Sequence, residues 1–561
     1  MKEDRRNFVA FLVIAAIILI GWQAVQQRFF PAAPPATKVV NGKSQPLPKP
    51  AADPTADSPV ATRSRAQVLA STLRVRIDTP ALAGSINLVG ARIDDLVLKR
   101  HTESLQKNAP PIRLLSPAGA PNAYFAQLGW RGGPAPDAVW RASGTVLAPG
   151  KPVRLETASP TGQRFRIDLS VDQDYMFTVR QTVLNAGAAP VRVAPYGLVN
   201  RTGTSKDADF WTMHAGPMWV GEDGAQYDPD YGELDEAPTT FRSTGGWLGF
   251  TDMYWLTALV PDQGQAFEGQ FRAGPNKSYQ ADFAMAERAL APGQALTTTS
   301  RLFLGAKEVR VLDRYADAGV KQLDYAIDWG WFYWFEKPIF YYLDWLFRLV
   351  GNFGVAIILL TVTIRLLMFP IANKQFASMA AMRVVQPKMK AIQERYKDDK
   401  ERMQREVMAL YKQEGVNPLA GCLPVLLQIP IFYALYKVLM LTIEMRHQPF
   451  IGWIKDLSAP DPLTPINLFG ILPFDPPGFL HLGVLAILLG VTMWLQFKLS
   501  PPAGDPATQQ VMMFMPWMMM FIFAPLAAGL QLYYVASNII SIAQQKLLYA
   551  RHPGLREAPA K

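Results

Sequence analysis

Two patterns of hydrophobic positions divide the chain: uninterrupted apolar runs at its start and over its last two fifths, and short alternating runs between them. The first run, residues 8–25, carries no charge and is about long enough to cross a bilayer. Three basic residues precede it: Lys2, Arg5 and Arg6. A cleaved signal peptide is the alternative, but no small-x-small cleavage site follows Trp22. We therefore predict an N-terminal transmembrane anchor at residues 1–30, with the N-terminus in the cytoplasm.

The alternating runs predict a large β domain outside the cytoplasm. Residues 31–65 are rich in Pro and Ala and predict a flexible linker. In the stretch that follows, Leu73, Val75 and Ile77 alternate with charged residues. Residues 165–171 and 175–179 repeat this alternation around a turn at Asp172-Gln173-Asp174, which is typical of a β-hairpin. Many such runs predict an antiparallel β-sandwich over residues 66–320, beyond the first span and therefore periplasmic.

Residues 321–350 mix aromatic rings with charges, a composition too polar for a span and too aromatic for an ordinary loop. Such a segment is expected to lie in the outer membrane interface as an amphipathic helix, because amphipathic rings settle there. Pro338 is expected to break this helix into two pieces.

Five further apolar runs complete a predicted set of six transmembrane helices. They cover residues 351–372, 419–441, 480–498, 511–525 and 527–548. An even number of spans places both termini on the same side. The loop between the first two runs and the tail at 549–561 are rich in Lys and Arg, and basic segments stay inside. The sequence thus predicts a mixed fold: a five-helix core at 351–548 plus the anchor, with cytoplasmic termini and a periplasmic β domain.

Within that basic loop, apolar residues recur at steps of three and four. They are Met389, Ile392 and Tyr396, then Met403, Val407 and Leu410, with KDDKE at 397–401 between the two sets. This pattern predicts a cytoplasmic hairpin of two helices at 373–418. Its charge has two readings, a solvated face that obeys the positive-inside rule or a landing site for ribosomal RNA or anionic lipid.

The cysteines, histidines and short motifs of the chain limit the kinds of chemical site that it could contain. Cys422 is the only cysteine, which excludes an internal disulfide framework, and it fits a small buried hydrophobe. The predicted β domain contains His101 and His214 far apart, with no nucleophile elbow or metal-ligand spacing, and Asp94-Asp95 resembles a pair of solvated turn charges. No phosphate-binding loop occurs either, so we predict no cofactor, no metal and no catalytic site. A carbohydrate-active β domain remains an alternative.

Polar residues inside the apolar runs are the candidate functional residues. Arg365, with Thr361 one turn earlier, lies about 10 Å from the inner end of its run if that end is near Ala372. Gln428 lies at a similar depth in the next run. One face of the last run carries Gln531, Tyr534, Asn538, Ser541 and Gln545. Each group alone could form an interhelical hydrogen bond, but their common depth with a charge among them favours a hydrated cavity.

The run at 511–525 contains six methionines within VMMFMPWMMMFIF. Methionine is flexible and polarizable, so it suits a surface that accepts many apolar shapes, although plain core filling is the alternative. The run is short for a span, which favours local thinning of the bilayer.

Three motifs together resemble the YidC family of bacterial membrane-protein insertases: TVTIRLLMFP, NPLAGCLPVLLQIPIF and GLQLYYVASNIISIAQQ. The resemblance covers the chain end to end in its Gram-negative form. It implies a hydrophilic groove open to the cytoplasm and to lipid, with Arg365 inside it and Gln428 and the last span as other walls. It also implies that the outer domain is a β-supersandwich of sugar-mutarotase type, linked to the Sec translocon.

This resemblance predicts an insertase and chaperone of the inner membrane, acting alone or with the Sec translocon. The expected partners are nascent membrane proteins, membrane lipids, and ribosome or signal-recognition components at 373–418 and the C-terminal tail. A transporter or channel is the main alternative, because intramembrane charge also marks ion paths. Against it, the sequence has no obvious inverted repeat and no acidic residue near Arg365.

Overall fold

The computed structural model describes residues 37–40, 43–46, 63–206, 213–396, 399–414, 423–469, 471–472, 482–499 and 506–551. The predicted anchor at 1–30, Cys422 and most of the basic tail lie outside the described residues. The chain divides into two units, residues 1–58 and 59–561. In the first unit, β1 (Thr37–Val40) and β2 (Lys43–Pro46) pair antiparallel within the predicted linker. The Asn-Gly pair between them is a hairpin signal that the Pro/Ala-rich composition concealed.

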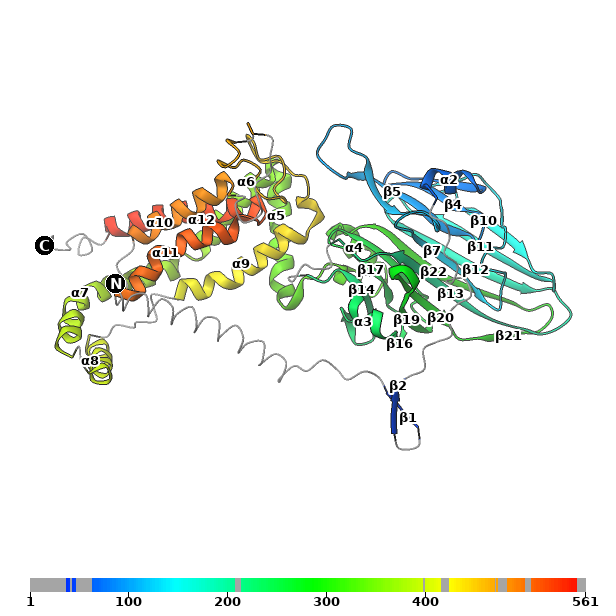
Figure 1. Cartoon of the computed structure of the whole chain (residues 1–561), viewed down its shortest axis with the longest axis horizontal. Helices are drawn as coiled ribbons and strands as arrows, with labels where there is room; N and C mark the ends of the chain where they lie inside the picture. The colour runs from blue at the N-terminus through cyan, green and yellow to red at the C-terminus, as the bar shows by residue number, and fades with distance from the viewer. Residues whose placement is uncertain are drawn as a thin grey trace. The chain divides into compact units, whose positions relative to one another are not determined.

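Two β-sheets form the domain whose strands run from residue 74 to residue 306 (Figure 1). The nine-stranded sheet has the order β15 (Gly224–Gln226), β14 (Gly216–Gly221), β17 (Trp247–Thr251), β18 (Trp255–Val260), β22 (Ala295–Ala306), β12 (Met176–Asn185), β11 (Gln163–Val171), β10 (Val153–Ala158), β8 (Arg141–Ala142). The eleven-stranded sheet has the order β16 (Thr239–Thr244), β19 (Ala266–Gly274), β20 (Ser278–Met285), β13 (Val191–Thr202), β7 (Tyr124–Arg131), β5 (Arg92–Thr102), β4 (Leu82–Asn87), β3 (Arg74–Asp78), β9 (Val146–Leu147), with β6 (Pro111–Leu115) paired to β5 and β21 (Arg288–Leu290) to β13. Among the described strands the pairs are antiparallel except β3 with β9, which confirms the predicted strand direction.

Large aromatic side chains join the two sheets. Trp130 of β7 packs on Phe165 of β11 with ring centroids 5.2 Å apart. Phe250 of β17 meets Phe271 of β19 at 6.3 Å, and both side chains are fully buried. Aromatic pairs of this kind add attraction beyond the area they bury. The core of the domain therefore lies between the two inner sheet faces.

The predicted hairpin around Asp172 is confirmed. β11 and β12 pair with Leu169 opposite Val179, and the inward residues of both strands are buried. The Asp172 carboxylate accepts hydrogen bonds from the backbone N–H of Asp174 at 2.9 Å and of Met176 at 3.1 Å. An aspartate that satisfies amides further along the chain is a standard way to close a turn.

Two smaller expectations in this domain are wrong. Leu73 is 76% exposed because β3 begins only at the next residue. Asp94 and Asp95 are buried within β5 and form ion pairs with Arg74 and Arg65. A bulge in the pairing of β4 with β5 brings both carboxylates into the sheet, so they are not solvated turn charges.

The helices that the structure describes are, in chain order, α2 (Arg65–Ala70), α3 (Tyr231–Glu236), α4 (Val309–Asp317), α5 (Tyr333–Val350), α6 (Phe353–Leu367), α7 (Phe369–Arg395), α8 (Lys400–Gln413), α9 (Leu423–Leu441), α10 (Val484–Leu499), α11 (Pro506–Phe523) and α12 (Ala528–Arg551). Short 3₁₀ turns are η1 (Pro275–Lys277), η2 (Leu323–Ala326), η3 (Gly330–Phe332) and η5 (Ile443–Met445). In the part of the chain that the structure describes, no helix is both long enough and apolar enough to cross a membrane. The count of six spans therefore stays a prediction.

The α5 helix runs unbroken through Pro338, so the predicted break is wrong. Pro338 is the sixth residue of α5 and has no N–H to donate to the Trp334 carbonyl, so the helix continues with one intrahelical hydrogen bond fewer. The helix ends at Gly351, which adopts a left-handed φ of 70°. Asn352 then caps α6, because its side chain accepts from the backbone N–H of Val355 at 3.0 Å.

The apolar run at 351–372 is not one helix. α6 ends at Leu367, and α7 starts at Phe369 with Pro370 in its first turn. Proline favours this position because a first-turn N–H has no helical partner. Arg365 therefore lies in the last turn of α6, about 3 Å of helical rise from the end of that helix. The predicted distance of about 10 Å is wrong, because it assumed that the helix ends near Ala372.

The two helices of the basic loop, α7 and α8, pack on each other. Val385, Met389 and Leu410 form a small buried cluster between them, supported by Ile392, Val407 and Tyr411. Lys388 of α7 pairs with Glu414 beyond α8 at 2.6 Å. The periodicity predicted that Tyr396 would belong to this core. Its ring instead lies under the guanidinium of Arg402, whose central carbon is 5.3 Å from the ring centroid.

Candidate functional site

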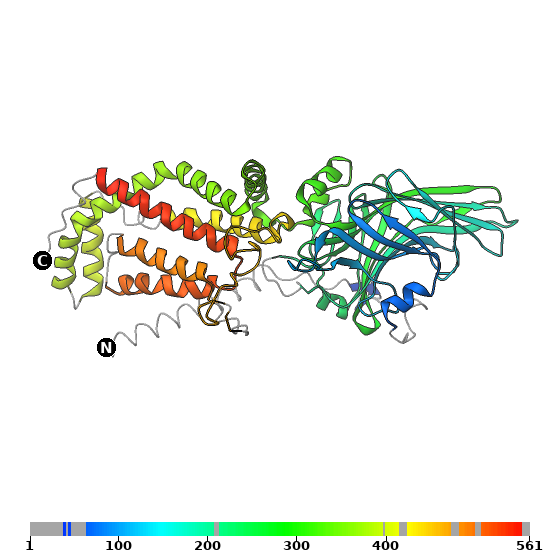
Figure 2. The ribbon, with the colours of Figure 1, turned by 90° about the horizontal axis from the view of Figure 1, so that it is seen from above.

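Three helices position the candidate residues. Figure 2 shows α12, in red, lying between the green α6 and the orange pair α10 and α11. α9 also contacts α12. The buried face of α12 carries polar side chains along much of its length: Gln531, Ser537, Asn538, Ser541 and Gln545. Helical periodicity explains why these residues share one side, since positions three and four apart lie above one another.

Arg365 is bound to α12 through its side chain and its backbone. Its Nε donates to Ser537 Oγ at 3.1 Å, and its Nη2 donates to the same oxygen. Gln544 Nε2 donates to the Arg365 carbonyl at 3.3 Å. Among the described residues no carboxylate forms an ion pair with Arg365, and the hydroxyls of Tyr533 and Tyr534 interact with it electrostatically. The guanidinium therefore lies beside neutral acceptors.

Two further polar contacts connect α12 to its neighbours. Gln428 Nε2, on α9, donates to the hydroxyl of Tyr533 at 2.7 Å. Asn538 Nδ2 donates to Thr492 Oγ1 on α10 at 3.1 Å. Four helices are therefore joined at this level by hydrogen bonds between side chains.

Other predicted residues satisfy their polar groups locally. The hydroxyl of Thr361 donates to the Ile357 carbonyl at 2.7 Å, and that of Ser541 donates to the Ser537 carbonyl at 2.8 Å. Gln531 donates to carbonyl oxygens of Phe523, Ala524 and Leu526, at the end of α11 and just beyond it. Gln531 is thus a cap for α11, the structural role that a polar residue in an apolar helix often has.

Tyr534 and Gln545 lie on the same helix but in different surroundings. The Tyr534 ring packs edge-on against Phe523 at 4.7 Å and against Phe432 at 5.5 Å, so an aromatic wall adjoins the polar contacts. Gln545 is buried, 3% exposed, one turn beyond Ser541. On α11, Met513 and Met518 are exposed, whereas Met519 packs on the core, so core filling accounts for Met519 and a client-binding use of the exposed methionines stays a prediction.

Sequence reasoning missed three residues of this site: Ser537, Tyr533 and Thr492. Ser537 and Tyr533 each precede a residue that was identified, and they are themselves one turn apart. Thr492 is one of few polar residues in an otherwise apolar run. Their neighbours in sequence could have suggested them, but only the rotation of α12 against α6, α9 and α10 decides which side chains touch.

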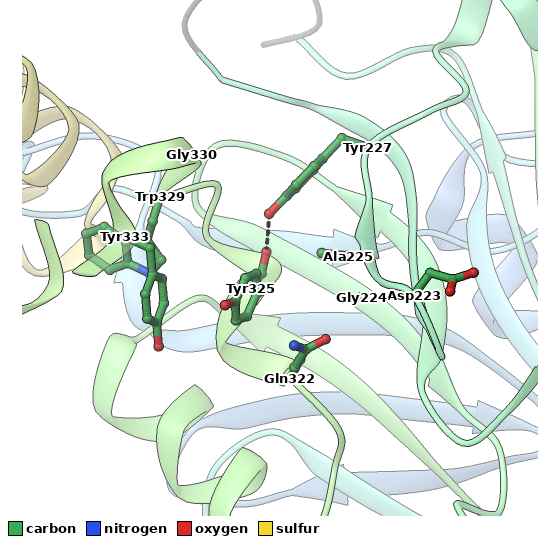
Figure 3. A pocket seen from close by; sticks show the side chains of 9 residues that line it. All are labelled: Asp223, Gly224, Ala225, Tyr227, Gln322, Tyr325, Trp329, Gly330 and Tyr333. Carbon is green, nitrogen blue, oxygen red and sulfur yellow. Dashed lines mark hydrogen bonds between the residues drawn. The ribbon is translucent and has the colours of Figure 1, made fainter. Parts of the chain in front are cut away.

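A cavity of about 320 Å³ lies elsewhere, between β15 and the segment that leads into α5. Figure 3 shows the rings of Tyr227, Tyr325 and Tyr333 around it, with the Tyr227 hydroxyl donating to the Tyr325 carbonyl at 3.1 Å. The Asp223 side chain points away from these rings in Figure 3. None of the predicted site residues lines this cavity.

Buried carboxyl groups occupy the region where α4 and α5 meet η5. The Glu444 carboxylate accepts from the backbone N–H of Val309 at 2.9 Å, and Arg310 donates to Asp344 at 2.5 and 2.9 Å. Burial raises the pKa of Glu444 to about 8. Burial also raises the pKa of Glu336 to about 8, with Lys437 opposing the shift.

These two pKa values predict that the folded state loses stability as the pH rises from about 5 to about 8. In this window the folded protein keeps both carboxyl protons, while the unfolded chain, with glutamate pKa near 4.3, has lost them. The stabilisation is complete below the unfolded pKa and is lost as the pH rises through the folded one. Thermal unfolding of the full chain at pH 5 and pH 8 measures this slope. The variant carrying Glu336→Gln and Glu444→Gln should flatten it, and an unchanged slope would contradict the assignment.

Family models match most of the chain. Residues 74–342 match the model described as YidC periplasmic domain, and residues 345–554 match the 60Kd inner membrane protein model. A relative from Zymomonas mobilis, named membrane protein insertase YidC, is 51% identical over 98% of this chain and 96% of its own length. A relative of the same name from Methylorubrum extorquens is 43% identical over the same shares.

Two solved structures are similar in part. A crystal structure of an active YidC insertase covers 94% of this chain and 98% of its own, at 18% identity and a TM-score of 0.35. A galactose mutarotase related enzyme from Lactobacillus acidophilus covers 41% of this chain and 97% of its own, at 8% identity and a TM-score of 0.30. Scores this low do not establish a shared fold, so the β-supersandwich stays a prediction.

Proposed function

The chain belongs to the YidC family of membrane protein insertases, and from this premise we propose that it inserts nascent proteins into the inner membrane and assists their folding there. The role is that of an insertase, with no covalent reaction. The observation that carries the mechanism is the positive charge of Arg365, which is held by Ser537 among neutral polar groups of α6, α9, α10 and α12 and forms no ion pair with any described residue.

We propose a topology of six spans with both termini in the cytoplasm. The β domain, residues 66–320, would be periplasmic, and the helical hairpin at 373–418 would be cytoplasmic. The distribution of Lys and Arg supports this orientation, because basic loops remain inside. The match of residues 74–342 to a periplasmic domain model supports the same side for the β domain.

The proposed groove is formed by Arg365, Thr361, Gln428, Tyr534, Asn538, Ser541 and Gln545, with Ser537 and Tyr533 added from the contacts above. It would be open to the cytoplasm and to lipid. Moving the polar end of a client across pure hydrocarbon is prohibitive, because its backbone and charged groups lose their hydrogen bonds to water. A hydrated groove that reaches part of the way shortens this dry path, and the Arg365 guanidinium offers a fixed charge for acidic client residues.

Release of the client would proceed along the aromatic and methionine wall. Tyr534, Phe432 and Phe523 form one side of it, and the exposed Met513 and Met518 of α11 extend it. Apolar client helices slide along such a wall into lipid, where their burial supplies the driving force. The proposed partners are therefore nascent membrane proteins and lipids, together with the Sec translocon.

Reconstitution of the full chain into vesicles tests this function. We expect insertion of a small membrane protein with a short acidic translocated segment to depend on the chain. The same vesicles should show no specific solute flux. Specific flux without insertion would favour the transporter alternative and overturn the proposal.

The hairpin of α7 and α8 is proposed to dock the ribosome or signal-recognition components, together with the C-terminal tail. Lys390 and Arg395 are exposed and form no ion pair with any residue that the structure describes, whereas Lys388 pairs with Glu414. We expect Lys390→Glu with Arg395→Glu to weaken ribosome binding and reduce its salt dependence, since each phosphate contact contributes to the salt slope.

Co-sedimentation of the intact protein with ribosomes over a range of salt concentrations measures this effect. Arg113→Glu with Arg164→Glu, at two exposed positions of the β domain, is the matched control for a general loss of positive charge. If both variants bind as the parent does, the basic face serves only to orient the protein in the membrane.

A further inference from the structure

The chain between α9 and α10 contains an apolar tip, formed by residues 463–469 and 471–472. Five large apolar side chains of this tip are exposed: Ile466 by 38%, Leu468 by 52%, Phe469 by 53%, Ile471 by 78% and Leu472 by 40%. The sequence holds no charged residue between Asp461 and Asp475. Figure 2 shows this loop, in brown, at the end of the helices where α10 begins.

Four amides of the tip donate to carbonyl oxygens of the tip. Leu468 N donates to Pro465 O at 3.0 Å, Phe469 N to Thr464 O at 2.8 Å, Ile471 N to Leu468 O at 3.3 Å and Leu472 N to Asn467 O at 3.0 Å. These bonds reduce the number of backbone donors that need water. In hydrocarbon each backbone polar group must find its partner within the protein, so such a backbone suits burial in lipid.

The tip is also held firmly in place. Asp461, fully buried, accepts from Trp453 Nε1 at 2.9 Å, from Leu463 N at 3.1 Å and from Leu485 N in the first turn of α10 at 2.8 Å. Leu468 and Phe469 adopt left-handed φ values of 50° and 59°. Large side chains rarely adopt this conformation, and their strained backbone turns both outward from a fixed base.

We propose that the apolar tip inserts into the outer leaflet of the bilayer and binds the acyl region of its lipids. Three observations select lipid as the occupant. The tip carries no charge, and four of its amides are paired within it. Asp461 at its base binds the first turn of α10, which itself exposes the apolar residues Leu488, Val491 and Leu495. Among the described residues of the tip no exposed side chain is polar, whereas a protein-binding surface would combine an apolar centre with a polar rim. Inserted beside α10, the tip displaces headgroups and thins the leaflet that a client must reach.

This inference rests on the proposed topology, and the experiment separates the two. Cys422→Ser removes the only cysteine, and single cysteines then replace Ile471 in the tip, Leu495 on α10 and Leu73 in the β domain. Each full-length variant is spin-labelled in vesicles, and collisions with oxygen and with a water-soluble nickel chelate are compared. Oxygen concentrates in the acyl region, whereas the chelate stays in water.

We expect the labels at 471 and 495 to collide mainly with oxygen and the label at 73 mainly with the nickel chelate. A label at 471 that behaves like the one at 73, while 495 remains in lipid, overturns the tip insertion alone. A label at 471 that neither reagent reaches means that protein covers the tip, and this result also overturns the proposed insertion. A label at 495 in water overturns the topology itself.

Discussion

Arg365→Ala should slow the insertion of clients with acidic translocated segments about tenfold, because a charge–charge attraction of about 1–2 kcal/mol in a partly hydrated site is lost. The effect should be smallest for clients whose translocated segment is neutral. Arg365 forms no ion pair among the described residues, so its removal leaves no buried carboxylate behind and the fold should persist. Insertion rates of matched acidic and neutral clients in reconstituted vesicles measure the difference.

Two further variants separate charge from geometry. Arg365→Lys keeps the positive charge and should retain most of the activity on acidic clients. Ser537→Ala removes the hydroxyl that both Nε and Nη2 bind, so it should reduce discrimination between acidic and neutral clients while leaving the charge in place. Equal insertion of acidic clients by the parent and a well-expressed Arg365→Ala variant would refute the electrostatic role.

Lys437→Met should destabilise the folded chain by about 3 kcal/mol or more, since removing one partner of a buried ion pair leaves the other uncompensated. Lys437 is 2% exposed and donates to the Asp328 backbone oxygen at 2.9 Å and to its carboxylate at 3.3 Å. The fully buried Glu336 lies close enough to interact with the same ammonium group. Thermal or denaturant unfolding of the full chain in detergent measures the loss.

The double variant with Lys437→Met and Asp328→Asn is the internal check. Neutralising both partners should recover part of the stability, because no unpaired charge remains. Lys498→Met, at an exposed position on α10 beside Trp494, should change stability by no more than about 0.5 kcal/mol. If Lys437→Met and Lys498→Met have equal effects, the buried pair contributes nothing.

The predicted elements that the structure confirms are those whose pattern is local. Phe165, Ile167 and Leu169 alternate with polar residues, and a half-buried strand requires that period, so β11 could be recognised at once. The polar face of α12 follows from helical periodicity in the same way. Pro338 and Pro370 show the limit of local rules, because a proline's effect depends on where the helix begins.

Asp94, Asp95 and Lys437 were misjudged or overlooked for a common reason. Their partners, Arg74, Arg65 and Asp328, lie 20, 30 and 109 positions away. A charge in a sequence is most often solvated, and only a distant residue brought close by the fold makes its burial possible.

The sequence by itself determined the family, the β domain with its antiparallel strands, and the polar residues that set α6 and α12 apart from ordinary apolar helices. These features depend on local periodicity and on the residue types present, both of which can be read along the chain. Only the tertiary structure decided that Ser537 binds Arg365, that Tyr533 binds Gln428 and that four amides of the apolar tip bind carbonyl oxygens within it. Such contacts depend on the rotation of each helix about its axis and on backbone turns, and these are fixed by packing between segments far apart in the sequence.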